Sequence, residues 1–367
     1  MINMDINKIF TNEIVNDNFA NLVENHRMLD DILRDDKGKL FISDWYCYHP
    51  FIDKFTQNIE VTDKQKQDYI FYSDDYELKQ LISKMHMKFD KKFYDSDTEI
   101  LPSDGSSPSI ATFCFWLYKN NIKEVYYLSP LYYTFYYFFE LFKIKARPIS
   151  GKQGYEKDFT MNLPDKKTLL IICDPIWYAG QSIKKELINK INEWQKKTKS
   201  YIFVDGSFQY TQWSDNRFEE TSIFDKNYTF RLICPTKFLA LHGYRFSYLL
   251  LPSNYYEEFL YLYGNNIGST NAYNTAFAKK AISIMLEDSY NIELTNFVKN
   301  IYNLLCSNGT IRTTIIPNCG YFIFGEVIKN IDNFHSMTQK YFEQKNFPNY
   351  CRINLLGGKN LEPFTKF

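Results

Sequence analysis

The sequence predicts an α/β fold, with a mostly parallel sheet covered by helices on both faces in a large domain, followed by a smaller α+β domain. Strand-length apolar runs without alternating polar positions, such as residues 168–174 and 201–205, are typical of strands buried on both faces. Helix-length segments alternate with them, as in βα units. The chain has 367 residues, more than the roughly 100–200 usual for one domain, which favours two domains.

The expected elements follow in chain order. A polar helix over residues 13–35 ends at the turn signal of residues 35–38. Further helices are expected over residues 78–88, from the turn at 104–108 to 119, and over 131–142, 182–197, 253–263, 270–287, 292–305 and 333–344. Strands are expected over residues 124–128, 168–174, 201–205, 229–234, 244–251, 310–316, 320–327 and 351–356. We divide the chain into an N-terminal arm (1–45) that packs with the small domain, a large domain (46–287) and a small C-terminal domain (288–367).

Composition excludes several classes of protein. Lys and Arg total 43 against 43 Asp and Glu, so nothing indicates a polyanion such as nucleic acid as a partner. The seven cysteines are scattered without a Cys-x-x-Cys pair, which indicates reduced thiols and no metal site. The N-terminus lacks the apolar segment of a secretory signal, and the apolar stretch 126–142 is too short and too interrupted to span a membrane. We therefore expect a cytoplasmic protein without membrane contact.

Polar residues fall where several predicted strands end. These are the turn at residues 104–107, Asp174, Asp205 and Lys237, and the last three are spaced by 31 and 32 residues, about one strand–helix unit each. Ligands of such sheets bind beyond the carboxyl ends of the strands. A lysine amine, a carboxylate and a helix N-terminus together suit pyridoxal 5′-phosphate (PLP), which needs an imine partner, a partner for its pyridine nitrogen and a phosphate site.

The segment around the lysine carries a known pattern. Residues 234–245 resemble the Ser-x-x-Lys-(x)5-Gly-x-Arg motif of fold-type-I PLP-dependent enzymes, specifically the class I/II aminotransferases, with Arg245 eight residues after Lys237. The resemblance implies an aspartate-aminotransferase-like fold, a Schiff base between the cofactor and Lys237, and a phosphate held by Arg245. An Arg fork suits that phosphate better than a Lys point charge. Cys234 replaces the usual hydroxyl residue, and the nearby Thr236 is assigned to the cofactor instead.

Six further segments resemble family motifs and follow in the family's order. They are residues 72–78, 105–107, 130–132, 174–180, 204–208 and 351–355. The resemblance implies that Gly105, Ser106 and Ser107 bind the phosphate, Tyr132 stacks on the cofactor, Asp205 pairs with its pyridine nitrogen, Tyr72 reaches the partner subunit's phosphate, and Arg352 binds the substrate carboxylate. Ordinary structural roles compete with these: a helix cap for Asp205, core packing for Tyr132, a surface turn for Tyr72, and an ordinary strand-edge position for Arg352.

Two positions depart from the family. The Asn and Tyr that donate hydrogen bonds to the cofactor's phenolate oxygen correspond to Trp177 and Phe208, and Phe has no donor. Tyr178 or Gln209, each one residue away, could substitute. Among the histidines, only His242 is expected near the site.

Three functions are therefore weighed. The first is a PLP-dependent aminotransferase of an amino acid or amino-carboxylate, acting as a homodimer with the site at the interface. The second is another PLP-dependent reaction, such as elimination, cyclisation or decarboxylation, and the third is a non-catalytic relative.

Overall fold

The computed structural model describes residues 40–67, 69, 75–90, 98–128, 130–214, 219–287, 289–329, 334–338, 342 and 346–365. The helix expected over residues 13–35 and Tyr72 lie outside these residues. Among the helices of the described ranges, none combines the length and the apolar character needed to cross a membrane.

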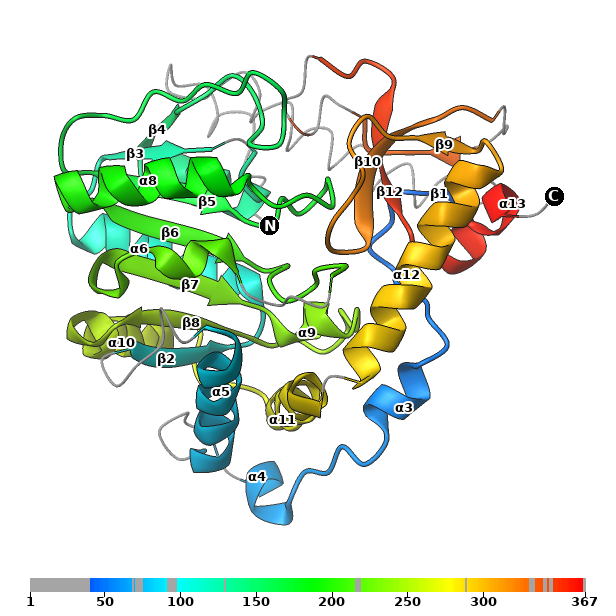
Figure 1. Cartoon of the computed structure of the whole chain (residues 1–367). Coiled ribbons are helices and arrows are strands. Elements are labelled where there is room, and N and C mark those ends of the chain that lie inside the picture. The colour runs from blue at the N-terminus through cyan, green and yellow to red at the C-terminus, as the bar shows by residue number, and fades with distance from the viewer. Residues whose placement is uncertain are drawn as a thin grey trace, which may run out of the picture.

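A seven-stranded sheet forms the larger part of the structure (Figure 1). Its strand order is β2 (Thr98–Ser103), β8 (Ser247–Pro252), β7 (Thr229–Ile233), β6 (Tyr201–Gly206), β5 (Leu169–Cys173), β3 (Glu124–Tyr127) and β4 (Lys145–Pro148). The neighbours from β7 to β4 pair in parallel, while β8 is antiparallel to both β7 and β2. The mostly parallel sheet is thus confirmed.

Helices cover this sheet on both faces. They are α5 (Tyr76–Phe89), α6 (Ser106–Lys119), α7 (Tyr133–Leu141), α8 (Lys185–Thr198) and α10 (Tyr256–Asn266), while α11 (Ala272–Glu287) packs against α5 and α9 (Pro235–Phe238). In Figure 1, α8 lies in front of the sheet and α6 lies behind it. All five residues of β5 are buried, as expected of a strand covered on both sides. On α8, apolar residues at helical spacing, Leu187, Ile188 and Ile191, face the core.

Two strands of the sheet, β2 and β4, have no counterpart among the predicted elements. Both lie at the edges of the sheet, and each contains a proline, Pro102 in β2 and Pro148 in β4. Edge strands tolerate proline because one side of their backbone needs no ladder partner. The residues of β4 are largely exposed, so β4 lacks the apolar run by which buried strands are recognised. β2 is mostly buried, but only two of its six residues, Ile100 and Leu101, form an apolar run.

The C-terminal part forms a smaller α+β region (Figure 1). Helix α12 (Ser289–Ser307) precedes an antiparallel sheet of β9 (Ile311–Arg312), β10 (Phe322–Val327) and β12 (Tyr350–Asn354), in the order β12-β10-β9. The short helix α13 (Glu362–Thr365) belongs to this region, whereas the short helices α3 (Ile52–Thr56) and α4 (Asp63–Gln67) precede α5 in the chain. The boundaries at residues 45/46 and 287/288 stay predictions.

The helix expected over residues 333–344 is wrong where the structure describes it. Phe334–His335 form strand β11, which pairs in parallel with β1 (Leu40–Phe41). The Phe334 ring also packs against Phe364 in α13, at 5.6 Å between ring centroids. Pairing with β1 and this ring contact favour an extended backbone, which the helix-like spacing of the segment does not reveal. The strand expected over 310–316 is likewise only two residues long.

Candidate active site

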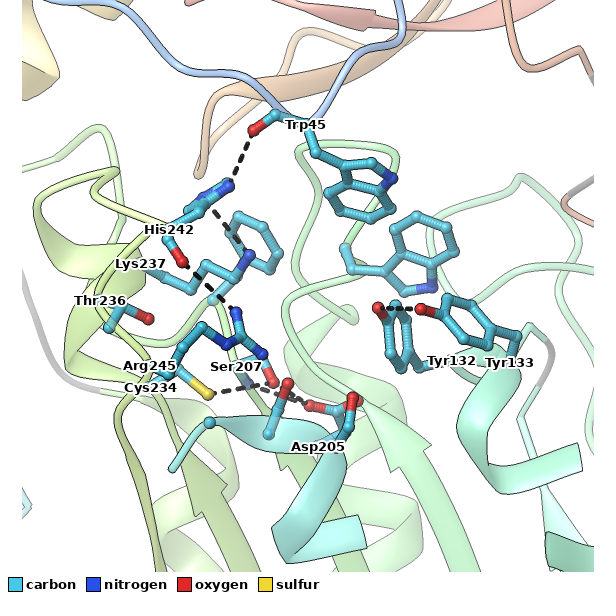
Figure 2. A pocket seen from close by; sticks show the side chains of 15 residues that line it. Trp45, Tyr132, Tyr133, Asp205, Ser207, Cys234, Thr236, Lys237, His242 and Arg245 are labelled. Atoms are coloured by element: carbon cyan, nitrogen blue, oxygen red, sulfur yellow. Dashed lines mark hydrogen bonds between the residues drawn. The ribbon is translucent and has the colours of Figure 1, made fainter. Parts of the chain in front are cut away.

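A cavity of about 290 Å³ lies where the strands of the large sheet end (Figure 2). Its walls come from the ends of β2, β3, β5, β6 and β7 and the segments that follow them, together with residue Trp45. Ten of the predicted site residues line it: Gly105, Ser106, Ser107, Tyr132, Trp177, Asp205, Phe208, Thr236, Lys237 and Arg245. Tyr72 lies outside the described residues, and Arg352 lies behind the wall of the cavity.

Gly105 and Arg245 form one end of this cavity. Gly105 has φ of 98°, a left-handed value that L side chains rarely adopt, and a Cβ there would lie 2.7 Å from Arg245 Nη2. The glycine thus allows the guanidinium to approach the start of α6, where no side chain caps the helix. Free N–H groups at a helix N-terminus and an adjacent arginine are suited to a phosphate.

Lys237 lies in the four-residue helix α9 (Pro235–Phe238) directly after β7. Its Nζ atom is 3.3 Å from His242 Nε2 and 5.1 Å from the centre of the Phe208 ring. Burial, with smaller contributions from Arg245 and Arg352, lowers the pKa of Lys237 to about 8. A lysine in these surroundings is partly a free amine near neutral pH, the form that attacks carbonyl carbon.

Asp205 is the fifth residue of β6 and is buried. Its Oδ1 atom accepts hydrogen bonds from the Ser207 backbone N–H at 3.1 Å and the Ser207 hydroxyl at 2.6 Å. Burial raises the pKa of Asp205, while the bonds from Ser207 and the charge of Lys237 oppose that rise. A protonated ring nitrogen would stabilise this carboxylate further.

Aromatic rings form the opposite wall. Trp45 stacks on Trp177 at 5.7 Å and 16°, and the Tyr132 ring meets Trp177 edge-on at 5.9 Å. The Tyr132 hydroxyl donates to Tyr133 at 3.0 Å. The indole Nε1 of Trp177 is buried and has no hydrogen-bond partner in the described parts of the chain. It is an unused donor at the position where the family has Asn.

The two suggested substitutes for the missing donors do not line the cavity. The Tyr178 hydroxyl bonds Tyr155 at 3.1 Å. Gln209 accepts from Arg231 at 2.6 Å and donates to Thr221 at 2.8 Å. Both side chains are therefore engaged in the interior.

Arg352 is fully buried behind Trp45. Its guanidinium carbon lies 3.8 Å from the centre of the Trp45 ring and 4.5 Å from that of Phe322, and Nη2 donates to the Ser43 carbonyl. Burial lowers the pKa of Arg352 to about 9. Its Nε and Nη1 have no hydrogen-bond partner within the described ranges. Such a cation is costly to bury without an anion.

Two other strand-end aspartates do not reach the cavity. Asp174 Oδ1 accepts from the Ile183 backbone N–H at 2.7 Å, and Asp104 Oδ1 accepts from Asn274 Nδ2 at 3.1 Å. Conversely, the cavity contains residues that sequence reasoning did not assign to it: Trp45, Tyr133 and Ser207. Ser207 is next to Phe208 and Tyr133 is next to Tyr132, so their closeness in sequence to predicted site residues could have identified them. Trp45 belongs to no motif.

The comparisons with known proteins agree with this geometry. The profile of the family described as aminotransferase class I and II matches residues 42–302, well over half of the chain. The chain belongs to this family. Its members are PLP-dependent transferases. A search of curated protein sequences finds no significant match for this aminotransferase.

Solved structures share the fold of this aminotransferase at low sequence identity. A putative kynurenine aminotransferase of Saccharomyces cerevisiae has a TM-score of 0.73 at 13% identity, covering 98% of both chains. A protein of Escherichia coli with a methionine aminotransferase function has 0.71 at 11%, covering 97% of this chain and 98% of that one. An aromatic aminotransferase of Pyrococcus horikoshii has 0.71 at 18%, covering 92% and 96%. The aspartate-aminotransferase-like fold is thus confirmed.

The residues present fit PLP. The cradle of Gly105 and Arg245 matches its phosphate, Asp205 matches its pyridine nitrogen, and Lys237 matches its aldehyde. The unused Nε1 donor of Trp177 is available to an acceptor on the ring. Phe208 brings no donor to this aminotransferase site.

Proposed function

We propose that this aminotransferase acts on an amino acid or amino-carboxylate and carries its cofactor on Lys237. The observation that carries the proposal is the convergence of three groups on one cavity. These are the buried amine of Lys237, the carboxylate of Asp205 and the phosphate cradle of Gly105 and Arg245.

When bound, PLP supplies an electrophilic carbon for the substrate's amino group and a ring that withdraws electrons from the substrate's Cα. Arg245 and the N-terminus of α6 would hold its phosphate, and Asp205 would keep its ring nitrogen protonated. The free amine of Lys237 would be placed to take the proton from the substrate's Cα as a base and to deliver a proton again as an acid. Its lowered pKa, about 8, suits a group that must both accept and donate a proton near neutral pH.

Arg352 is proposed to bind the substrate carboxylate. Its buried guanidinium has two nitrogen atoms, Nε and Nη1, without partners in the described residues. A carboxylate facing the edge formed by Nη1 and Nη2 could accept two hydrogen bonds in a bidentate pair. The Trp45 indole covers this guanidinium, so we propose that the indole moves aside when the carboxylate binds.

A second PLP-dependent reaction, such as elimination, cyclisation or decarboxylation, is favoured by one observation. Phe208 donates no hydrogen bond, and Tyr178 and Gln209 are engaged elsewhere. The phenolate oxygen of the cofactor would therefore have fewer donors than in the family pattern. This difference alters the electronic state of the ring, on which the course of the reaction depends.

We also propose a homodimer in which Tyr72 contacts the partner subunit's phosphate. A two-fold dimer is the commonest assembly of soluble proteins. Light scattering of the purified protein tests this proposal, and a stable monomer that is active would contradict it.

Borohydride reduction tests the cofactor assignment. The protein loaded with PLP is reduced, digested and mapped, with Lys237→Ala as the control. A pyridoxyl label on Lys237 alone is expected, and a label on another lysine would overturn the assignment. Addition of amino acids to the unreduced protein then follows the visible spectrum. Its conversion to the pyridoxamine form supports transamination, whereas spectral change without that form supports the second reaction class.

A further inference from the structure

We propose that His242 is a positioning residue that holds the amine of Lys237 through its Nε2 atom. The inference rests on the proposed function only for the role of Lys237. His242 follows α9 by four residues and lines the same cavity. Figure 2 shows its ring between the Lys237 side chain and the backbone of Trp45.

The backbone of Trp45 determines which nitrogen of His242 carries hydrogen. His242 Nδ1 lies 3.0 Å from the Trp45 carbonyl oxygen, which can only accept. Nδ1 must therefore carry the hydrogen and donate it. In a neutral ring, Nε2 is then left with a lone pair, and this atom is the one that lies 3.3 Å from Lys237 Nζ.

The surroundings of His242 keep its ring neutral. Burial is the largest cause that holds its pKa well below the ordinary value, and the charges of Lys237, Arg245 and Arg352 act in the same direction. Tyr321 is the other titratable group that contacts the ring, with its hydroxyl against Nε2. A second positive charge beside Lys237 is thus disfavoured, and Nε2 remains an acceptor.

Two donors compete for this single lone pair. Lys237 Nζ and the Tyr321 hydroxyl both lie within hydrogen-bonding distance of Nε2. A hydrogen bond from Lys237 directs one N–H toward His242 and thereby orients the amine. It also stabilises the ammonium form, against the desolvation that lowers the pKa of Lys237. Removal of His242 and removal of the Tyr321 hydroxyl should consequently shift that pKa in opposite directions.

The experiment measures the pKa of Lys237 in the full chain before PLP is added. The protein is acylated briefly at a series of pH values, and the label on Lys237 is quantified by peptide mass spectrometry. His242→Phe should lower the pKa by about one unit, since a hydrogen bond to a charged group is lost. At pH values below the pKa, the fraction of Lys237 present as the free amine should then rise about tenfold. Tyr321→Phe should raise the pKa, with a severalfold smaller free-amine fraction.

Two amide variants separate positioning from packing. The Gln side chain in His242→Gln can place an acceptor oxygen near the position of Nε2, so the pKa should stay close to that of the unmodified protein. The shorter side chain in His242→Asn reaches only the position of Nδ1, so it should behave like His242→Phe. Equal shifts in the Gln and Asn variants, or no shift in any of the four, would overturn the proposal. Failure of the protein to bind PLP would instead overturn the proposed function and leave this titration measurable.

Discussion

The guanidinium of Arg352 lies over the Trp45 indole, with its central carbon 3.8 Å from the ring centroid. This contact gives a buried cation some stabilisation, but Nε and Nη1 still lack partners in the described structure. The protein therefore holds a charge whose burial is only partly compensated. A residue kept under such conditions is expected to serve a ligand.

Replacing Arg352 by Met should separate stability from function. The free energy of unfolding should be unchanged or higher, by up to about 4 kcal/mol, because an apolar side chain of similar length replaces a poorly paired charge. The reaction with amino acids should slow at least about 100-fold, because two charge-assisted hydrogen bonds of about 1.5–3 kcal/mol each are lost. Urea unfolding and single-turnover absorbance measure the two effects. Arg352→Lys, which keeps the charge, is the control, and a Met variant that reacts normally would contradict the assignment.

Gly105→Ala should weaken cofactor binding. The added Cβ would lie 2.7 Å from Arg245 Nη2 and displace the guanidinium from the phosphate cradle. We expect the dissociation constant for PLP to rise at least about tenfold, equal to 1.4 kcal/mol. Gly268→Ala is a matched control, since Gly268 has φ of 103° but nothing within 4 Å of the added Cβ. Its backbone strain should lower stability while leaving PLP affinity unchanged, and equal loss of affinity in both variants would show that strain alone is responsible.

Asp174 should make stability depend on pH. Burial raises its pKa from 3.8 to about 7 in the folded protein. Between these values the folded state retains a proton that the unfolded state has released. The free energy of unfolding should therefore fall as pH rises from 4 to 7, by up to about 4 kcal/mol, at about 1.4 kcal/mol per pKa unit.

Asp174→Asn should remove that dependence. The amide oxygen can still accept from Ile183, but it carries no charge. Urea unfolding at pH 4 and pH 8 should show the variant gaining stability at the higher pH. Asp165→Asn is the control, because that side chain is 78% exposed and should change stability by less than about 1 kcal/mol. Parallel pH profiles for Asp174→Asn and the unmodified protein would contradict the prediction.

Phe208→Tyr should shift the pH at which the visible band of the PLP-loaded protein changes. A hydroxyl at this position would donate to the phenolate oxygen, favour its deprotonated form, and lower the pKa of the cofactor–lysine linkage by roughly one unit. Spectrophotometric titration measures this shift. Phe208→Leu adds no donor and should leave the pKa unchanged. An unchanged or higher pKa in the Tyr variant would show that another donor already serves the oxygen.

The parts of the fold that could be predicted are determined by residues close together in the sequence. Continuous apolar runs such as Leu169–Cys173 indicate strands buried on both faces, whatever surrounds them. The spacing of Asp205 and Lys237 by about one strand–helix unit places both at one edge of a parallel sheet, and the structure brings them to one cavity. Gly105 and Arg245 came from the family resemblance.

The remaining parts depend on contacts between distant residues. Trp45 contacts Trp177 and Arg352, which lie far from it in the sequence. Because helix and strand periodicity relates only neighbouring residues, the sequence around Trp45 does not mark it as part of the cavity wall. The direction in which the His242 side chain points depends on the turn after α9, where Ala240 has φ of 52°. Strand β11 forms because β1 is available beside it, which the local sequence cannot indicate.

The attachment of Trp45 has a consequence for the order of events during synthesis. The segment carrying it is fastened by residues near the end of the chain: Asn354 Nδ2 donates to the Asp44 carbonyl at 2.9 Å, across 310 positions. The Met337 backbone N–H likewise donates to the Ser43 hydroxyl at 2.8 Å. A nascent chain that has not reached residue 354 therefore lacks the contacts that hold this wall in place. The complete cavity can therefore form only once residues 337 and 354 have left the ribosome, so any cofactor would be captured after that segment has been made.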